Sequence, residues 1–532
     1  MPDDVMPQDA NNKEPIPQGR GGIGQVQHLA KEAAILLSSG IVSYVGAFAL
    51  QVLTARTLGD AAYGAWAVAF ALANTLATFG LMGADWIILR QGSFYEGTGD
   101  VRRLRKTIRL ALSLSSLGLG LLALAVFVAS PLIATEVLHR DSLTPVIRVV
   151  AIMGPIMGLG QVLLFGTQAF KRMRESALIR NILQPAARLA FTAVALLVSA
   201  TPLAALTGML CAEIVLAAAS FYALNRKISL RGPTQPIEQR ELIKFALPIW
   251  STKFLGQTRT QLFPLLLGSL AALTASGAFV ASQRVAVAPS AIIATLNTVY
   301  TPMGSDLYLQ GRRDELKVLF QSIGKWSFAL GFPLFCLQVS FPEEILSLFG
   351  ESFRAARTAL ILLAVATLFN FGTGPVATTL VMIGRSRLAL LDHVIVVAVE
   401  VALGVWLIPR HGLLGAAISR LIGTALTNCL RLIQVHYIVG FHPYRLDYWK
   451  PLAAGLVAAV TAKLAVTGLA LGQGVAAAAA ATAIIAVTYV PIVLALGLGP
   501  EDRAAIHILT KRLRRRRSPP PDSWSSVPPD LG

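Results

Sequence analysis

The sequence predicts an all-α membrane protein that crosses a bilayer about fourteen times. Of its 532 residues, 55% are hydrophobic and 14% are charged, whereas soluble domains carry about 25% charged residues. Apolar runs separated by short polar loops recur along the chain, and the mean hydropathy is +0.63. Basic residues gather in alternate loops, which is typical of a protein with many membrane spans.

Fourteen apolar runs approach or exceed the roughly 20 residues that a membrane-spanning helix needs. They cover residues 33–53, 62–89, 109–129, 145–168, 182–199, 203–224, 245–268, 277–300, 322–341, 357–384, 388–409, 412–440, 451–471 and 475–497. The preceding residues 1–32 are polar and contain no secretory signal. We therefore expect the first run to be a retained signal anchor.

The basic residues set the orientation. With the N-terminus inside, the inner segments hold 31 of the 46 Lys and Arg residues and the outer loops hold four. This asymmetry predicts that both termini are cytoplasmic. It also explains most of the net charge of +18, so we expect no nucleic-acid partner. The basic segment from Lys511 to Arg517 is expected to lie on anionic lipids, and docking of a cytoplasmic partner is the alternative.

An internal repeat divides the chain. A shift of 213 residues aligns Gly64-Ala65-Trp66 with Gly277-Ala278-Phe279; six spans precede Lys244, and six more follow it before the last two spans. Because six is even, both copies keep the same orientation, and they should be related by an axis along the membrane normal. The predicted segments are a polar N-terminal tail (1–32), a six-helix bundle (33–224), a cytoplasmic linker (225–244), a second six-helix bundle (245–440), accessory helices thirteen and fourteen (441–497) and a basic, Pro/Ser-rich tail (498–532).

Three motifs resemble a known family. Ala55-Arg56-Thr57-Leu58-Gly59-Asp60-Ala61-Ala62-Tyr63-Gly64 resembles the turn between the first two helices of the polysaccharide-transport flippases, which belong to the multidrug/oligosaccharidyl-lipid/polysaccharide exporter superfamily. Leu242-Ile243-Lys244-Phe245-Ala246-Leu247-Pro248 resembles the entry to their seventh helix. Gly412-Leu413-Leu414-Gly415-Ala416-Ala417 resembles the start of their twelfth. The likeness extends over roughly residues 30–500.

The resemblance implies two six-helix bundles that form a V around a central cavity, with two accessory helices. It also implies a flippase of the bacterial cytoplasmic (inner) membrane, which moves undecaprenyl-diphosphate-linked oligosaccharide between leaflets by alternating access. Partners would be the lipid-linked glycan and the glycan polymerase and export machinery. Related lipid II flippases carry arginines in helices one, two and eight. Here helix one has no cation before Arg56, so only Arg284 has a counterpart.

The seventh span, 245–268, contains two cations at membrane depth, where each costs at least about 2.5 kcal/mol. Its polar residues share one helical face, which predicts that they look into a polar cavity. A diphosphate passing there would need cations and hydrogen-bond donors. Snorkelling or interhelical hydrogen bonding is the alternative. The candidate cavity residues on helices seven, eight and twelve are Lys253, Gln257, Arg259, Gln261, Gln283, Arg284 and Arg420.

Two pairs of opposite charges lie on neighbouring spans: Arg188 with Glu213, and Glu400 with Arg420. Buried charges persist by pairing, so we expect salt bridges inside the bundles. The alternative is an ion-coupling site, in which Glu213 and Glu400 would accept a proton or a sodium ion.

Asp85 and Arg90, at the inner end of helix two, are candidates for a gate pair, with interfacial anchoring as the alternative.

The sequence carries no catalytic signature, no metal-ligand spacing and no phosphate-cradling glycine loop, so we expect a transporter without a cofactor. Two rival functions remain. A multidrug or cation antiporter of the same superfamily should have an acidic site, and helices seven and eight are basic. A membrane glycan polymerase or ligase needs a sizeable outer loop, and the longest here, 130–144 and 342–356, have about fifteen residues.

Overall fold

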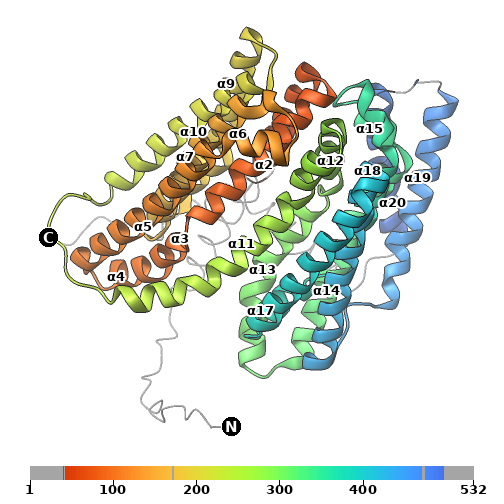
Figure 1. Ribbon diagram of the computed structural model, residues 1–532. Coiled ribbons are helices and arrows are strands. Elements are labelled where there is room, and N and C mark those ends of the chain that lie inside the picture. The colour runs from red at the N-terminus through yellow and green to blue at the C-terminus, as the bar shows by residue number, and fades with distance from the viewer. Residues whose placement is uncertain (1–39, 41, 171–172, 470–471, 473, 497–532) are drawn as a thin grey trace, which may run out of the picture.

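The computed structural model describes residues 40, 42–170, 173–469, 472 and 474–496, and within these the regular structure is helical throughout (Figure 1). Residues 42–58 are helical. The remaining elements of the first half are α2 (Asp60–Gly80), α3 (Ala84–Ile87), η1 (Ile88–Gly92), α4 (Ser93–Gly97), α5 (Val101–Val128), α6 (Ser130–Leu132), η2 (Ile133–Val137), η3 (Asp141–Leu143), α7 (Thr144–Gln168), α8 (Met173–Leu178), η4 (Ile179–Leu183), α9 (Gln184–Val198) and α10 (Pro202–Asn225).

The second half begins with a long helix that crosses between the two groups of helices in Figure 1. Its elements are α11 (Gln239–Leu270), α12 (Leu273–Ala286), α13 (Ser290–Leu309), α14 (Arg313–Ser340), α15 (Pro342–Leu346), η5 (Glu351–Ala356), α16 (Arg357–Gly372), α17 (Val376–Met382) and α18 (Ser386–Val439). The C-terminal elements are η6 (Leu446–Tyr448), α19 (Trp449–Gly468) and α20 (Val475–Ala495). The predicted tails, with the basic segment 511–517, lie outside the described residues.

The all-helical membrane class is confirmed. In the described part of the chain, nine helices are long and apolar enough to cross a membrane, and α12 with α13, bent by 47°, makes a tenth if the pair is one span. The long α18 joins two helices at Gly412, whose φ of 52° and ψ of −123° are not helical. The sequence predicts a boundary between two spans at this glycine. The count of fourteen spans stays a prediction.

The two halves of the chain touch through a pair of glycines. A Cβ atom on Gly64 of α2 would lie 1.8 Å from the carbonyl oxygen of Leu273, and one on Gly277 of α12 would lie 2.8 Å from that of Asp60. The predicted shift of 213 residues converts Asp60 into Leu273 and Gly64 into Gly277. The contact of Gly64 with Leu273 in one direction therefore matches the contact of Gly277 with Asp60 in the other. A two-fold axis between the halves produces this kind of reciprocal pair.

The helices of the two halves also follow the same order. The helix α5 begins at Val101 and α14 at Arg313, an offset of 212 residues, while α7 begins at Thr144 and α16 at Arg357, an offset of 213. In both halves, a short 3₁₀ helix comes directly before the fourth long helix: η3 before α7, and η5 before α16. Each half repeats one arrangement of helices.

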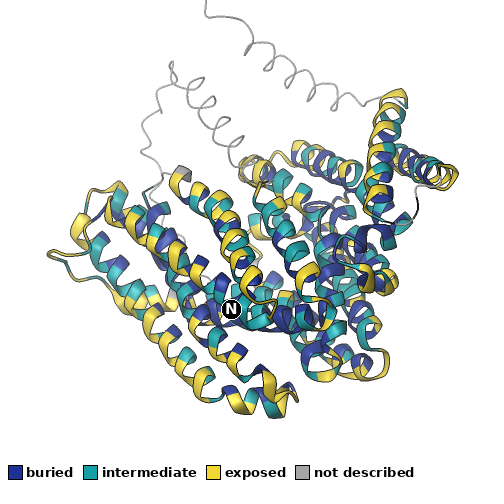
Figure 2. Ribbon diagram, turned by 90° about the horizontal axis from the view of Figure 1, so that it is seen from above, coloured by how far each residue is buried: buried dark blue, intermediate teal, exposed yellow. Residues whose placement is uncertain are grey.

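Aromatic side chains join the halves at the end that the charge pattern predicts to be outside. The fully buried Tyr63 stacks on Trp66 with ring centroids 5.3 Å apart and meets Phe353 of η5 edge-on at 5.7 Å. Arg56 donates a 2.7 Å hydrogen bond from its Nε to the carbonyl oxygen of Leu348. Exposed residues follow the outward faces of peripheral helices (Figure 2). Many of them are large and apolar, such as Leu121 of α5, which is 61% exposed. In a bilayer these faces would contact lipid tails.

Candidate functional site

The helix α11 lies between the halves and packs against both α2 and α18 (Figure 1). Near its N-terminal end, Trp250 donates a 3.2 Å hydrogen bond from its indole nitrogen to the carbonyl oxygen of Phe79 in α2. Phe254 meets the Phe79 ring edge-on at 5.0 Å. These contacts position the polar face of α11 beside the first half of the chain.

Two cavities, of about 820 Å³ and about 470 Å³, lie between the halves. Lys253 and Gln257 of α11 line the larger cavity, and Gln261 of the same helix lines the smaller one. A Cβ atom on Gly256 would meet no atom within 4 Å, so the helix surface is open there. Asn74, Gln184 and Arg188 line both cavities. The two voids are therefore neighbours.

Arg284 of α12 lines the smaller cavity, as does its neighbour Gln283. Its guanidinium carbon lies 4.8 Å from the centroid of the Tyr44 ring, and its Nη2 donates to the Tyr44 carbonyl oxygen at 3.4 Å. Its Nε is buried and has no hydrogen-bond partner among the described residues, and the same is true of the indole nitrogen of Trp66, which also lines this cavity. Two buried donors thus lack an acceptor.

The smaller cavity is cationic. Arg188 and Arg420 line it together with Arg284, and no Asp or Glu of the described residues does. Arg188 pairs with Glu213, which lines the larger cavity, and Arg420 pairs with Glu400, whereas the structure shows no carboxylate partner for Arg284 in its described part. An anion that enters the cavity would meet a guanidinium whose charge is not already balanced.

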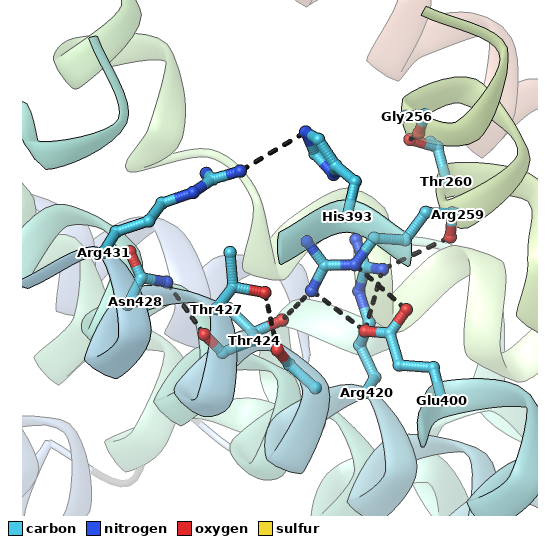
Figure 3. Close-up of polar contacts among 11 residues, drawn as sticks. Gly256, Arg259, Thr260, His393, Glu400, Arg420, Thr424, Thr427, Asn428 and Arg431 are labelled. Carbon is cyan, nitrogen blue, oxygen red and sulfur yellow. Dashed lines mark hydrogen bonds and ion pairs between the residues drawn. The ribbon is translucent and has the colours of Figure 1, made fainter. Parts of the chain in front are cut away.

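Arg259 differs from the expectation that it faces a cavity. Its Nε and Nη2 donate to the two carboxylate oxygens of Glu400 at 3.0 Å and 2.9 Å, and Nη2 also reaches Thr424 Oγ1 at 3.3 Å (Figure 3). The Nη1 of Arg420 lies 3.5 Å from the same carboxylate. Glu400 is 0% exposed, and a buried carboxylate requires cations as partners. Because Arg259 pairs with Glu400, its side chain lines neither of the two cavities.

The other half contains the matching pair. Arg188 of α9 donates from its Nε to Glu213 of α10 at 2.6 Å. The structure thus brings both expected pairs of opposite charge together, and it adds Arg259 to the second pair. Whether these carboxylates take part in ion coupling stays a prediction.

Asp85 belongs to the first half of the chain but forms its ion pair with a residue of the second half. Its carboxylate is 2% exposed and forms an ion pair with Lys253 of α11, while Arg90 lies exposed in the turn η1. The expected gate pair of Asp85 with Arg90 is therefore wrong in its partner: the buried carboxylate of Asp85 pairs with Lys253, which reaches it from α11. The Lys253 Nζ also lies 5.3 Å from the centroid of the Phe165 ring. An ion pair between α3 and α11 therefore connects the halves within the larger cavity.

A family model described as "Polysaccharide biosynthesis protein" matches residues 29–308, which is more than half of the chain. The chain belongs to this family. Stage V sporulation protein B of Bacillus subtilis (strain 168) is 22% identical to this polysaccharide biosynthesis protein over 445 residues, covering 78% of the chain and 84% of the relative. The resemblance that the motifs indicate is thereby confirmed.

Solved structures share the fold of this polysaccharide biosynthesis protein. The lipid II flippase MurJ in its inward closed conformation superposes with a TM-score of 0.68 at 13% identity, covering 86% of this chain and 98% of MurJ. An inward-facing multidrug resistance MATE family transporter of the MOP superfamily superposes with a TM-score of 0.59 at 14% identity, covering 77% and 98%. The chain therefore shares the fold of these two transporters, and its long apolar helices make it a multi-pass membrane protein.

Four polar residues of the chain that have polar contacts or line a cavity were not predicted from the sequence: Asp392, Gln434, Gln161 and Gln168. Asp392 accepts a 2.7 Å hydrogen bond from Gln434 and lies 3.7 Å from Arg431, whose Nη2 lies 3.3 Å from the His393 ring (Figure 3). Gln161 and Gln168 of α7 line the larger cavity. Their spacing of seven residues inside an apolar run is a signal that could have identified them. No group of three or more His, Cys, Asp or Glu side chains among the described residues could hold a metal ion.

Proposed function

We propose that the protein is a flippase for oligosaccharide or polysaccharide repeat units linked to undecaprenyl diphosphate. It would move them across the bacterial cytoplasmic membrane by alternating access, with both termini in the cytoplasm. This proposal rests above all on Arg284, a partly buried guanidinium between the halves, which has no carboxylate partner in the described residues. Family membership supports it, since the family is described by polysaccharide biosynthesis.

A diphosphate explains why such a group persists. An unpaired cation at membrane depth costs at least about 2.5 kcal/mol, so it is retained where an anion visits it. Guanidinium groups bind phosphate oxygens through two parallel hydrogen bonds, which gives both strength and orientation. The guanidinium of Arg284 lines the smaller cavity and is a donor of the kind that phosphate oxygens accept. The smaller cavity is therefore our candidate site for the diphosphate.

Two structural features argue against the antiporter and against the polymerase or ligase. A site for cationic drugs needs carboxylates, and the smaller cavity has three arginines and no acid among the described residues. A polymerase or ligase would need catalytic groups on an outer segment, and the segments between α5 and α7 and between α14 and α16 consist of short helical turns.

Arg284→Gln tests the proposal, because glutamine keeps hydrogen-bond donors and removes the charge. We expect the affinity of the purified protein for undecaprenyl diphosphate to fall about 10- to 100-fold, since a hydrogen bond to a charged group contributes about 1.5–3 kcal/mol. Translocation of fluorescent lipid-linked oligosaccharide in proteoliposomes should fall with it. Arg284→Lys should retain part of both.

Arg410→Gln is the matched control, because Arg410 is exposed, lines neither cavity and contacts Trp406 of its own helix. It should leave affinity and translocation unchanged. Unchanged binding and translocation by Arg284→Gln, in protein that unfolds at the normal temperature, would refute the proposed diphosphate site.

A further inference from the structure

The larger cavity has a different lining from the smaller one. It is rich in carboxamides, the side chains that both donate and accept hydrogen bonds. Gln161, Gln168 and Gln257 are partly buried and form no side-chain hydrogen bond with any residue in the described part of the chain. Their amide groups line the cavity and are therefore available to a ligand that enters it. The full carboxamide lining is Asn74, Gln161, Gln168, Gln184 and Gln257.

These carboxamides approach the void from both halves. Gln161 and Gln168 stand two turns apart on one face of α7, and Gln257 lies on α11. A molecule in the larger cavity would thus find donors and acceptors on more than one side. Such an arrangement suits a ligand with many hydroxyl groups, each of which also donates and accepts.

Aromatic surface accompanies the carboxamides. Trp86 lines the cavity and is 41% exposed, although it follows the almost fully buried Asp85. Phe165 lies on α7 between Gln161 and Gln168 and lines the same cavity. Sugar rings combine a flat C–H face, which packs on aromatic rings, with hydroxyl groups around the edge. An amphipathic ring of this type matches a wall of alternating aromatic and carboxamide side chains.

The charges of the larger cavity are mostly balanced by one another. Asp85 is paired with Lys253 and Arg188 with Glu213, and all four line the cavity. The fifth charged side chain of the lining, Arg180, is exposed. The smaller cavity instead presents Arg284 without a carboxylate among the described residues. One void is thus suited to an anion, and its neighbour to polar groups without charge.

We propose that the larger cavity binds uncharged sugar residues of the lipid-linked head group while the diphosphate occupies the smaller cavity. Trp86, Gln161 and Gln168 are then the residues that distinguish a glycosylated lipid carrier from the bare one. The inference rests on the proposed function. The shared lining at Asn74, Gln184 and Arg188 corresponds to the junction between the diphosphate and its first sugar.

The test compares two ligands: undecaprenyl diphosphate, and undecaprenyl diphosphate that carries one glucose residue. The native protein should bind the glucosylated lipid about tenfold or more tightly, the equivalent of one or two net hydrogen bonds. Combined Trp86→Phe, Gln161→Leu and Gln168→Leu substitutions should bring the two affinities close to equality, because the leucines keep the volume of glutamine without its hydrogen bonds and the phenylalanine offers a smaller aromatic face without the indole N–H. The affinity for bare undecaprenyl diphosphate should not change.

Gln321→Leu and Trp406→Phe are the matched controls, since neither residue lines a cavity, and both should keep the preference for the glucosylated lipid. Arg284→Gln should weaken both lipids equally and so reports on the proposed function alone. Equal affinities of the native protein for the two lipids would overturn the inference. So would a parallel loss of both lipids in the triple variant, or tighter binding of a carrier with glucuronate in place of glucose.

Discussion

At the scale of single residues, Arg259 shows how a buried carboxylate determines where a neighbouring arginine side chain points. Both Arg259 and Arg284 are cations in membrane helices, and helical periodicity places both near a polar face. Glu400 takes Arg259 as a bidentate partner, whereas Arg284 lies against the ring of Tyr44. The first arginine is therefore a structural partner in this conformation, and the second remains available to a ligand.

Removing Arg259 should destabilise the protein. Arg259→Met would leave the fully buried Glu400 with only the 3.5 Å contact to Arg420, and breaking a buried ion pair costs about 3–5 kcal/mol. We expect a clear fall in the thermal unfolding temperature in detergent. The double variant with Glu400→Gln should recover part of that loss.

The matched control for this measurement is Arg284→Met, which leaves no carboxylate unpaired among the described residues. It should change the unfolding temperature much less than Arg259→Met. Equal effects of the two substitutions would show that the Glu400 pairing is not what stabilises the bundle.

At the scale of elements, two glycines set how closely α2 and α12 approach. Gly64→Ala would place a methyl group 1.8 Å from the Leu273 carbonyl oxygen, and such a contact requires the helices to separate. We expect reduced yield of folded protein, or a loss of at least about 1–3 kcal/mol, the usual cost of overpacking. Size-exclusion chromatography and thermal unfolding measure both outcomes.

Gly256→Ala is the counterpart in α11, where no atom lies within 4 Å of the added Cβ. Alanine favours a helix over glycine by about 0.5–1 kcal/mol, so this variant should be as stable as the native chain or slightly more so. If Gly64→Ala behaves like Gly256→Ala, the close approach of α2 and α12 does not hold in solution.

At the scale of the whole molecule, the ion pair of Asp85 with Lys253 ties one half to the other through the larger cavity. Asp85→Asn should weaken that tie and favour conformations in which α11 separates from α3. A cysteine at Gln257 should then react faster with a water-soluble maleimide, in a chain whose own three cysteines are replaced. The charge exchange Asp85→Lys with Lys253→Asp should slow the reaction again.

An unchanged labelling rate in Asp85→Asn would show that the ion pair does not hold the halves together. Cysteine at Ser199, which is exposed between α9 and α10 and lines neither cavity, should label at the same rate in every variant. This position therefore controls for differences in reconstitution.

The sequence predicts the helical class, the repeat and the polar face of α11, because all three follow from periodicity and charge along a single chain. Pairing between distant helices is harder to predict. The partners of Asp85 and Arg259 lie 168 and 141 positions away, and helical spacing orders only near neighbours. The carboxamides of α7 were missed because polar uncharged residues in an apolar run resemble ordinary interhelical contacts.

The glycine contact between the halves has a mechanical consequence. Where Gly64 meets Gly277, the surfaces that touch are peptide backbone, so a tilt of one half against the other requires no rotamer changes at that point. During a rocking motion of the halves, this backbone contact would be kept, because no side chain has to move aside there. If the halves rock, the fixed point lies on the two-fold axis, and the excursion grows with distance from it, toward the end that holds the larger cavity.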